Sequence, residues 1–143
     1  MNNNLRWDNY FIDVADRTAR LSYAKKLQVG AVAVRDNRII LCGFNGTPSG
    51  DDNNCEDIID NILTTKPSVL HAEENLIVFA ANLGISLKGC NMYITHNPCS
   101  ICSRLIYGAG ITKVIYKDFY RDTSGLDFLK SRNVLINQYT GDI

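Results

Sequence analysis

Apolar side chains recur at helical spacing near the start of the chain. They are Trp7, Tyr10, Phe11, Val14, Ala15, Thr18 and Leu21. This spacing predicts an amphipathic helix that ends at about residues 21 to 24. Further helices are predicted over residues 72–83, 100–107 and 126–130. A glycine follows each of the first two of these helices, which is a common stop signal.

Short runs of apolar and β-branched residues alternate with the helical patterns. They predict strands over residues 29–34, 38–44, 91–95, 112–116 and 134–139. Asp36 and Asn37 separate the first two runs and predict a hairpin. Residues 45–67 are rich in Gly, Asn, Asp and Pro, so we expect a loop, with a short helical turn over 57–63. The order of elements predicts an α/β fold, with one mixed sheet covered by helices on both faces.

Composition narrows the class of protein. The chain has 143 residues, 45% of them hydrophobic and 21% charged, which suits one soluble globular domain over residues 1–143. No apolar run is long enough to cross a bilayer and no leader segment is apparent, so we expect a cytoplasmic protein without a membrane partner. Fifteen basic residues balance fifteen acidic ones, which argues against a nucleic acid as partner.

The candidate chemistry lies in two short motifs, His71-Ala72-Glu73 and Pro98-Cys99-Ser100-Ile101-Cys102. The pattern H-x-E…P-C-x-x-C is a known signature of zinc deaminases. One imidazole and two thiolates are preferred zinc ligands, and three protein ligands leave the fourth tetrahedral position open for water. With five cysteines, an odd number, metal binding is favoured over a disulfide framework. We therefore expect His71, Cys99 and Cys102 to hold a catalytic Zn²⁺.

Spacing places both motifs at helix starts. Cys99 and Cys102 are three residues apart and share one helix face, with Pro98 suited to begin that helix. His71 and Glu73 are two apart, so the next helix should begin here, with His71 near its cap. Glu73 is then a proton shuttle and not a metal ligand.

Simpler interpretations exist for each residue taken alone. A lone histidine is usually a satisfied core residue, and a lone C-x-x-C is compatible with redox chemistry or half of a zinc knuckle. Glu74 suits a solvated acid that complements the helix dipole. His96 is equally compatible with a contact near the metal or substrate and with a surface role.

Taken together, the motifs resemble the cytidine deaminase superfamily, and within it the deoxycytidylate deaminases. The resemblance covers residues 21–139. It rests on Gln28-Val29-Gly30-Ala31-Val32, on Gly43-Phe44-Asn45-Gly46-Thr47-Pro48-Ser49-Gly50, and on the segments 71–77 and 98–102. The Asn-Gly-x-Pro-x-Gly loop narrows the choice within the superfamily, although by itself it is also a common turn after a strand.

This resemblance implies a three-layer αβα sandwich with a mixed five-stranded sheet, as in cytidine deaminases. It also implies a homo-oligomer, commonly a hexamer, and hydrolytic loss of ammonia from C4 of a cytosine nucleotide. By the same likeness, Asn45 contacts the sugar and the backbone near Ala72 and Thr95 meets the pyrimidine edge. Tyr120 and Arg121 follow the strand ending at Tyr116, where the family builds substrate contacts, and we expect Arg121 to bind the phosphate.

The family likeness further implies regulation by nucleoside triphosphates with Mg²⁺, with dCTP as activator and dTTP as inhibitor. The candidate effector residues are Lys25, Lys26, Gly46, Thr47, Pro48 and Gly50. Glycines allow backbone amides to approach phosphates closely. Some relatives carry a second, structural zinc, but only Cys55 remains here in a comparable position, so we expect one zinc per chain.

Three alternatives remain open. A deaminase of free cytidine or deoxycytidine shares the metal motif and differs only in its need for a phosphate. A tRNA adenosine deaminase also shares the motif, but the neutral chain lacks the basic footprint of polynucleotide binding. A noncatalytic zinc-stabilised interaction domain would leave Glu73 and the open coordination position without a purpose.

Overall fold

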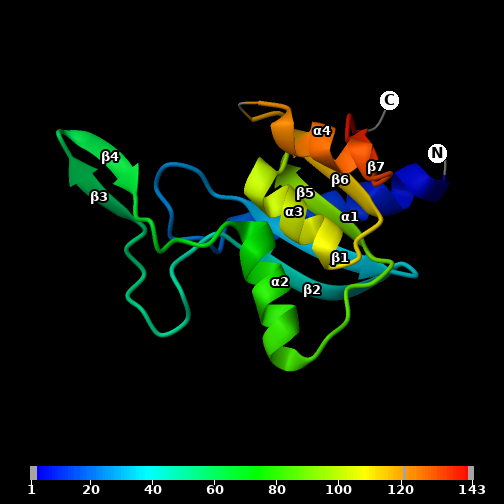
Figure 1. Ribbon diagram of the computed structural model, residues 1–143, viewed down its shortest axis with the longest axis horizontal. Helices are drawn as coiled ribbons and strands as arrows, with labels where there is room; N and C mark the ends of the chain where they lie inside the picture. Colours follow the sequence, from blue (N-terminus) through cyan, green and yellow to red (C-terminus); the bar gives the residue numbers. More distant parts are fainter. Residues whose placement is uncertain (1–2, 121, 142–143) are drawn as a thin grey trace.

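A computed structural model describes residues 3–120 and 122–141 of the chain (Figure 1). In chain order, its helices and strands are α1 Asn3–Ala19, β1 Gly30–Arg35, β2 Arg38–Phe44, β3 Glu56–Ile59, β4 Ile62–Thr65, α2 Ala72–Leu83, β5 Asn91–His96, α3 Ser100–Gly108, β6 Lys113–Asp118, α4 Ser124–Ser131 and β7 Leu135–Gln138. No helix among the described residues is long and apolar enough to cross a membrane.

The central sheet has five strands in the order β2-β1-β5-β6-β7. Strand β1 runs antiparallel to both β2 and β5, whereas β5, β6 and β7 are mutually parallel. The predicted mixed five-stranded sheet is confirmed. The predicted β1–β2 hairpin is also confirmed, because Asp36 and Asn37 both adopt positive φ, at 52° and 55°, as a tight two-residue turn requires.

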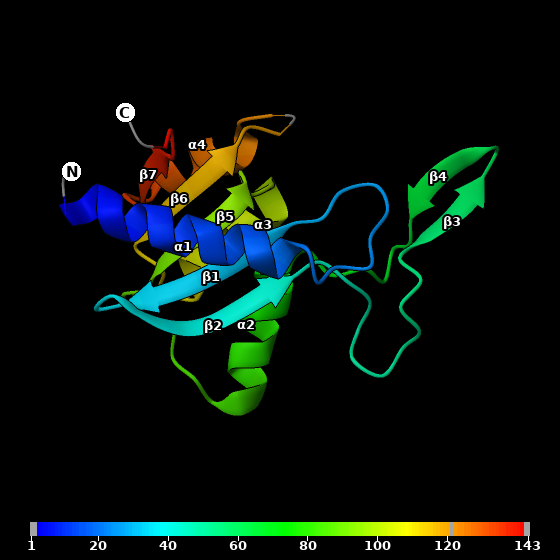
Figure 2. The same cartoon turned by 180° about the vertical axis from the view of Figure 1, so that it is seen from behind.

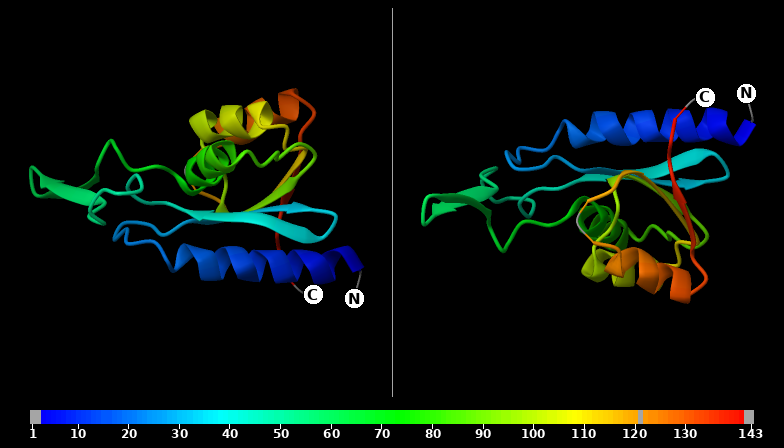
Figure 3. Two further views of the ribbon diagram at one scale, coloured as in Figure 1. Left: turned by 90° about the horizontal axis from the view of Figure 1, so that it is seen from below. Right: turned by 90° about the horizontal axis from the view of Figure 1, so that it is seen from above.

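Helices cover both faces of this sheet, which makes the predicted three-layer αβα sandwich (Figure 3). Helix α1 lies alone on one face, where Phe11, Ile12 and Ala15 pack against the β1, β5 and β6 side chains. Helices α2, α3 and α4 lie on the other face over the larger apolar core. Close contact of α1 depends on Gly30, because a Cβ there would lie 2.1 Å from the Ala15 carbonyl oxygen.

The segment between β2 and α2 differs from the prediction. Instead of a short helical turn over 57–63, strands β3 and β4 form a separate two-stranded hairpin that projects from the body (Figures 1 and 2). Asp60 and Asn61 both have positive φ, at 50° and 62°, and so close a tight hairpin turn. The β-branched Ile58, Ile59 and Ile62 favour extended backbone beside this turn.

Helix α1 ends earlier than predicted. Its last residue is Ala19, and the chain leaves the helix through a turn in which the Leu21 and Ser22 amides donate to Thr18 and Ala19 carbonyls. The Ser22 hydroxyl donates to the Asn45 carbonyl oxygen at 2.7 Å, so a long-range bond redirects the chain. Leu21, which continues the apolar spacing, is 53% exposed.

Candidate active site

The first helix start of the site is that of α2. His71 is its N-cap residue with extended backbone, and Gly84 ends the helix in the left-handed conformation, as the sequence predicts. The His71 amide donates to Glu74 Oε1 at 2.9 Å, so Glu74 caps the helix and is not merely a solvated acid. Gly43 of β2 lets this end approach the sheet, because a Cβ there would lie 2.8 Å from the Ala72 carbonyl oxygen.

The second helix start is that of α3. Cys99 is the N-cap residue, and its sulfur accepts a hydrogen bond from the Cys102 amide at 3.4 Å. Pro98 therefore precedes the cap instead of opening the helix. Both sulfurs lie at the positive end of the helix dipole, a position at which negative charge is stabilised.

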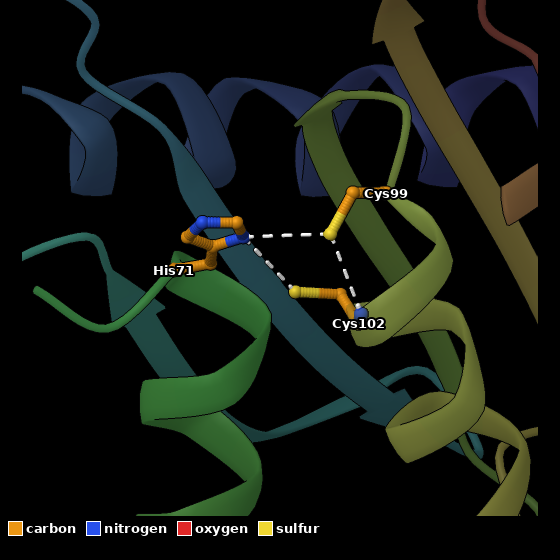
Figure 4. A group of neighbouring side chains, drawn as sticks. All are labelled: His71, Cys99 and Cys102. Carbon is orange, nitrogen blue, oxygen red and sulfur yellow. Dashed lines mark hydrogen bonds between the residues drawn. The ribbon is translucent and has the colours of Figure 1, made fainter. Parts of the chain in front are cut away.

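The two helix starts bring together the three predicted metal ligands (Figure 4). His71 Nδ1 lies 3.2 Å from Cys102 Sγ and 3.6 Å from Cys99 Sγ. Tetrahedral zinc bonds of about 2.3 Å to sulfur and 2.0–2.1 Å to nitrogen would separate such ligands by roughly 3.5 Å. The donor set and its spacing therefore fit Zn²⁺. Among the described residues, this is the one group of three or more His, Cys, Asp or Glu side chains close enough to hold a metal.

Proton affinities within the cluster are strongly perturbed. Hydrogen bonds from Cys102 and His71 lower the pKa of Cys99 to about 3. The hydrogen bond between His71 and Cys99 also raises the pKa of His71 to about 9. Sharing a proton with the Cys99 sulfur raises the pKa of Cys102. Glu73 is only 4% exposed, and burial raises its pKa to about 7. The cluster thus combines a ready thiolate with a buried carboxyl group.

A cavity of about 490 Å³ opens beside the cluster. Its wall includes His71, Cys99 and the buried Glu73, together with His96 and Tyr120. The His96 ring contacts Tyr120 edge to face at 6.0 Å, and burial lowers the pKa of His96. His96 therefore lies at the pocket and not in a separate surface position.

The residues expected to contact base and sugar lie at this cavity or directly behind it. Asn45 and Ala72 line it, whereas Thr95 is buried and its hydroxyl accepts the Gly30 amide at 3.2 Å. The Asn45 side chain accepts the Val29 amide and donates to the Leu27 carbonyl oxygen, both at 2.8 Å. Asn45 thus fixes the cavity wall and keeps one amide hydrogen for another acceptor.

The candidate effector residues divide between two places. Gly46, Thr47, Pro48 and Gly50 follow β2 in one loop, in which the Gly46 amide pairs with the Leu70 carbonyl oxygen. Gly50 has a φ of 97°, a conformation that favours glycine. Lys26 lines the cavity beside the metal cluster, and its neighbour Lys25 is exposed outside the described lining. Arg121, the expected ligand of the substrate phosphate, lies outside the described residues.

Asn97 is a site residue that the sequence did not indicate. It is buried, its side-chain oxygen accepts the Tyr120 amide, and its nitrogen donates to the Asp122 carbonyl oxygen at 3.1 Å. These bonds hold the segment after β6 against the metal-binding loop. The only signal in the sequence is its place between His96 and Pro98, which could have marked it as a neighbour of the site.

Gly125 is a second unanticipated residue, at the start of α4. A Cβ there would lie 2.3 Å from the Pro98 carbonyl oxygen and 2.7 Å from the Cys99 carbonyl carbon. We expect Gly125→Ala to displace Cys99, to cost about 1–3 kcal/mol of stability through overpacking, and to weaken zinc retention. Thermal unfolding and zinc analysis after dialysis test this. Gly108→Ala is the control, because nothing lies within 4 Å of its Cβ position; equal zinc retention in the two variants would contradict the expectation.

The chain is similar in sequence and structure to known deaminases. The family model described as "Cytidine and deoxycytidylate deaminase zinc-binding region" matches residues 5–118. The chain is 40% identical over 129 residues to human deoxycytidylate deaminase, with 83% of this chain and 69% of that protein covered. It is 36% identical over 121 residues to ComE operon protein 2 of Bacillus subtilis. That match covers 82% of the chain but only 62% of the Bacillus protein.

A similar solved structure is the dCMP deaminase of cyanophage S-TIM5 in complex with dCMP and dUMP. The TM-score is 0.87 at 36% sequence identity, and the match covers 97% of this chain and 99% of the phage chain. The similarity therefore extends over the whole sandwich and not only over the metal motifs.

Proposed function

Because the chain belongs to the cytidine and deoxycytidylate deaminase family, we propose that it converts deoxycytidine monophosphate (dCMP) to deoxyuridine monophosphate (dUMP) and ammonia. The observation that carries this proposal is the cavity of about 490 Å³ that unites a His/Cys/Cys cluster with the buried Glu73. Its volume suits a small-molecule ligand. The cyanophage relative with 36% identity supports the choice, since it binds both dCMP and dUMP.

His71, Cys99 and Cys102 are the residues that would hold the metal. Bound Zn²⁺ supplies Lewis acidity, which makes a water molecule nucleophilic near neutral pH. The His71 amide is fixed by Glu74, and the Cys99 sulfur is fixed by the Cys102 amide, so two of the ligands are held in place by the helix starts themselves.

Glu73 moves the protons. In the balanced reaction, the oxygen of water bonds to C4 of cytosine and the bond from C4 to the amino nitrogen breaks. One proton of the water ends on N3 and the other leaves with ammonia. Glu73 lies at the cavity wall and is almost fully buried, so its carboxyl group exchanges protons with the substrate and not with bulk solvent.

The substrate contacts follow from the wall of the cavity. We assign the sugar to the remaining amide hydrogen of Asn45 and the pyrimidine edge to the backbone near Ala72 and Thr95. Tyr120 lines the same cavity, and its ring stands against His96. Arg121 follows Tyr120 in the chain and stays the predicted phosphate ligand.

A substrate panel tests the reaction. Ammonia release is measured from dCMP, deoxycytidine, deoxycytidine triphosphate and a tRNA substrate, and dCMP should have the highest kcat/KM. Arg121→Ala should weaken use of the monophosphate by ~1.5–3 kcal/mol, the scale of a charged hydrogen bond, and leave the nucleoside rate nearly unchanged. A wild-type preference for the nucleoside would contradict dCMP as substrate. Equal losses for both substrates in Arg121→Ala would make that residue structural.

Regulation is proposed at the loop after β2. A nucleoside triphosphate with Mg²⁺ would bind against Gly46, Thr47, Pro48 and Gly50, with Lys25 of the turn before β1 as a candidate cation. Lys26, the other candidate cation of this turn, lines the catalytic cavity. The open space around Gly46, where the nearest heavy atom to a Cβ is 4.0 Å away, supports close approach of a phosphate. The activator would be dCTP and the inhibitor dTTP.

Titrating dCTP and dTTP with Mg²⁺ should shift the dCMP saturation curve in opposite directions. We expect coupling free energies of ~1–3 kcal/mol, because each effector must favour one conformation or assembly over another. Gly46→Val should reduce both shifts and the binding of each triphosphate. Unchanged wild-type curves at saturating effector would rule out regulation while leaving the deamination proposal intact.

We further propose that residues 1–143 form one deaminase domain, that the protein is cytoplasmic, and that it assembles as a hexamer. Exposed apolar side chains on two neighbouring helices support self-association. They are Val78, Phe79 and Leu83 of α2 and Ile101, Leu105 and Tyr107 of α3. The mass of the particle in solution, measured by light scattering, tests the assembly.

A further inference from the structure

Glu56 is a buried carboxylate outside the metal cluster. It opens strand β3, is only 5% exposed, and lines the same cavity as Glu73. Its Oε2 atom accepts the backbone amides of Lys25 at 2.8 Å and Lys26 at 3.2 Å. Its Oε1 atom has no hydrogen-bond partner among the described residues. Burial of a carboxylate is costly unless it is bonded, so the two amide bonds explain why this side chain lies here.

The bonds to Glu56 join two segments that are far apart in sequence. The turn after α1 and the β3–β4 hairpin both project from the end of the sheet at which α2 begins (Figures 1 and 2). Glu56 ties this turn to the base of the hairpin across about 30 residues of chain. Fixing the backbone at Lys26 limits the volume that its side chain can sample. The Lys26 side chain is thereby kept near the cavity that this residue lines.

The charges around this cavity give Lys26 a distinct place. Among the described residues that line it, Lys26 is the only lysine or arginine, whereas Glu56, Glu73 and Asp122 carry carboxyl groups. A doubly charged phosphate monoester would meet repulsion from these acids and requires a cation. The backbone amides at positions 25 and 26 are already engaged by Glu56. The Lys26 side chain is therefore the cationic donor that the described lining offers to a phosphate.

Resting on the proposed function, we propose that Lys26 binds the phosphate group of the nucleoside monophosphate, with Glu56 as its positioning residue. The phosphate and the reacting C4 atom lie at opposite ends of such a nucleotide. The wall of the cavity likewise includes the metal-binding residues His71 and Cys99. It also includes Lys26, from the turn after α1, and the hairpin residues Thr64 and Thr65. A lysine ammonium is a point charge that suits phosphate oxygens. Lys26 would thus select monophosphates over nucleosides within the catalytic cavity.

The first test compares dCMP with deoxycytidine in zinc-loaded protein. Lys26→Ala should lower the ratio of the two kcat/KM values roughly 10- to 100-fold, the range that a charged hydrogen bond gives. Lys26→Arg should restore most of that ratio, since it keeps the charge. Arg20→Ala is the matched control, because Arg20 is an exposed cation just after α1 and outside the described lining of the cavity. Equal ratios in Lys26→Ala and Arg20→Ala would overturn the assignment.

The second test separates positioning by Glu56 from a purely structural role. Glu56→Ala should raise KM for dCMP with little change in kcat or in nucleoside turnover. Glu56→Gln should largely rescue this KM, because its amide oxygen can still accept both backbone N–H groups. Parallel losses for dCMP and deoxycytidine, with no rescue by Gln, would contradict the positioning role.

Calorimetric measurement of dUMP and deoxyuridine binding tests phosphate recognition by Lys26 independently of dCMP deamination. If wild type releases no ammonia from dCMP, the proposed function fails. The Lys26 assignment is then still supported if wild type binds dUMP more tightly than deoxyuridine and Lys26→Ala loses that difference. If wild type deaminates dCMP but Lys26→Ala binds dUMP as tightly as wild type does, the reaction stands and the Lys26 assignment is overturned.

Discussion

Glu73→Ala is expected to retain zinc and to lose ~10²- to 10⁴-fold in kcat, the usual contribution of general acid–base catalysis. The metal stays because the three proposed ligands, His71, Cys99 and Cys102, are intact. Turnover falls because, among the described residues that line the cavity, Glu73 is the one carboxyl group in the first turn of α2, two residues after the proposed metal ligand His71. Zinc content and the rate of ammonia release are measured on the same preparation.

Two further variants make this result interpretable. Glu73→Gln preserves the size of the buried side chain but cannot accept a proton, so its rate should fall as far as that of Glu73→Ala. Asp57→Ala removes an exposed acid from the β3–β4 hairpin and should leave the rate unchanged. Full zinc occupancy with near-normal turnover in Glu73→Ala would remove the residue from the mechanism. Loss of zinc in that variant would instead make Glu73 part of the metal site.

The helix starts of the site were predictable because their signals are local. Gly84 takes the left-handed conformation that ends α2, and the two-residue spacing of His71 and Glu73 is compatible with one arrangement only, a helix that begins between them. Cys99 and Cys102 likewise occupy a cap and the first turn of α3. Each of these features is determined within about one helical turn of sequence.

The contacts that assemble the cavity were not predictable in the same way. Asn97 bonds to residues more than 20 positions away, and Glu56 bonds to the turn about 30 residues before it. Gly125 matters because of a carbonyl oxygen that lies near it only in the folded chain. A sequence pattern records none of these separations, since they depend on how β6, α4 and the hairpin pack.

The β3–β4 hairpin was not predictable from the sequence for a different reason. Asp60 and Asn61 are a recognisable turn pair, but the strands on either side expose Ile58, Ile59 and Ile62 and lack a buried apolar face. Because no apolar face of these strands is buried, apolar and polar residues do not alternate along them as they do in a half-buried strand. The many Gly, Asn, Asp and Pro residues of segment 45–67 therefore favoured a loop. The hairpin is stabilised instead by its own ladder and by the bonds at its base.

Cys102→Ala is expected to lose zinc and stability together, since one imidazole and one thiolate cannot hold the metal tightly. Cys99→Ala should behave in the same way, with further loss of the cap of α3. When the free zinc concentration is 100-fold above the Kd of the site, binding stabilises the fold by ~2.7 kcal/mol. That contribution disappears when the metal is lost. Wild type should contain about one zinc per chain after dialysis, as a single three-ligand site requires.

The matched control is Cys42→Ala, which removes an exposed thiol of β2 outside the cluster and should keep both the zinc content and the melting temperature of wild type. Two zinc ions per wild-type chain would reveal a second metal site, and full zinc in Cys102→Ala would exclude that sulfur as a ligand.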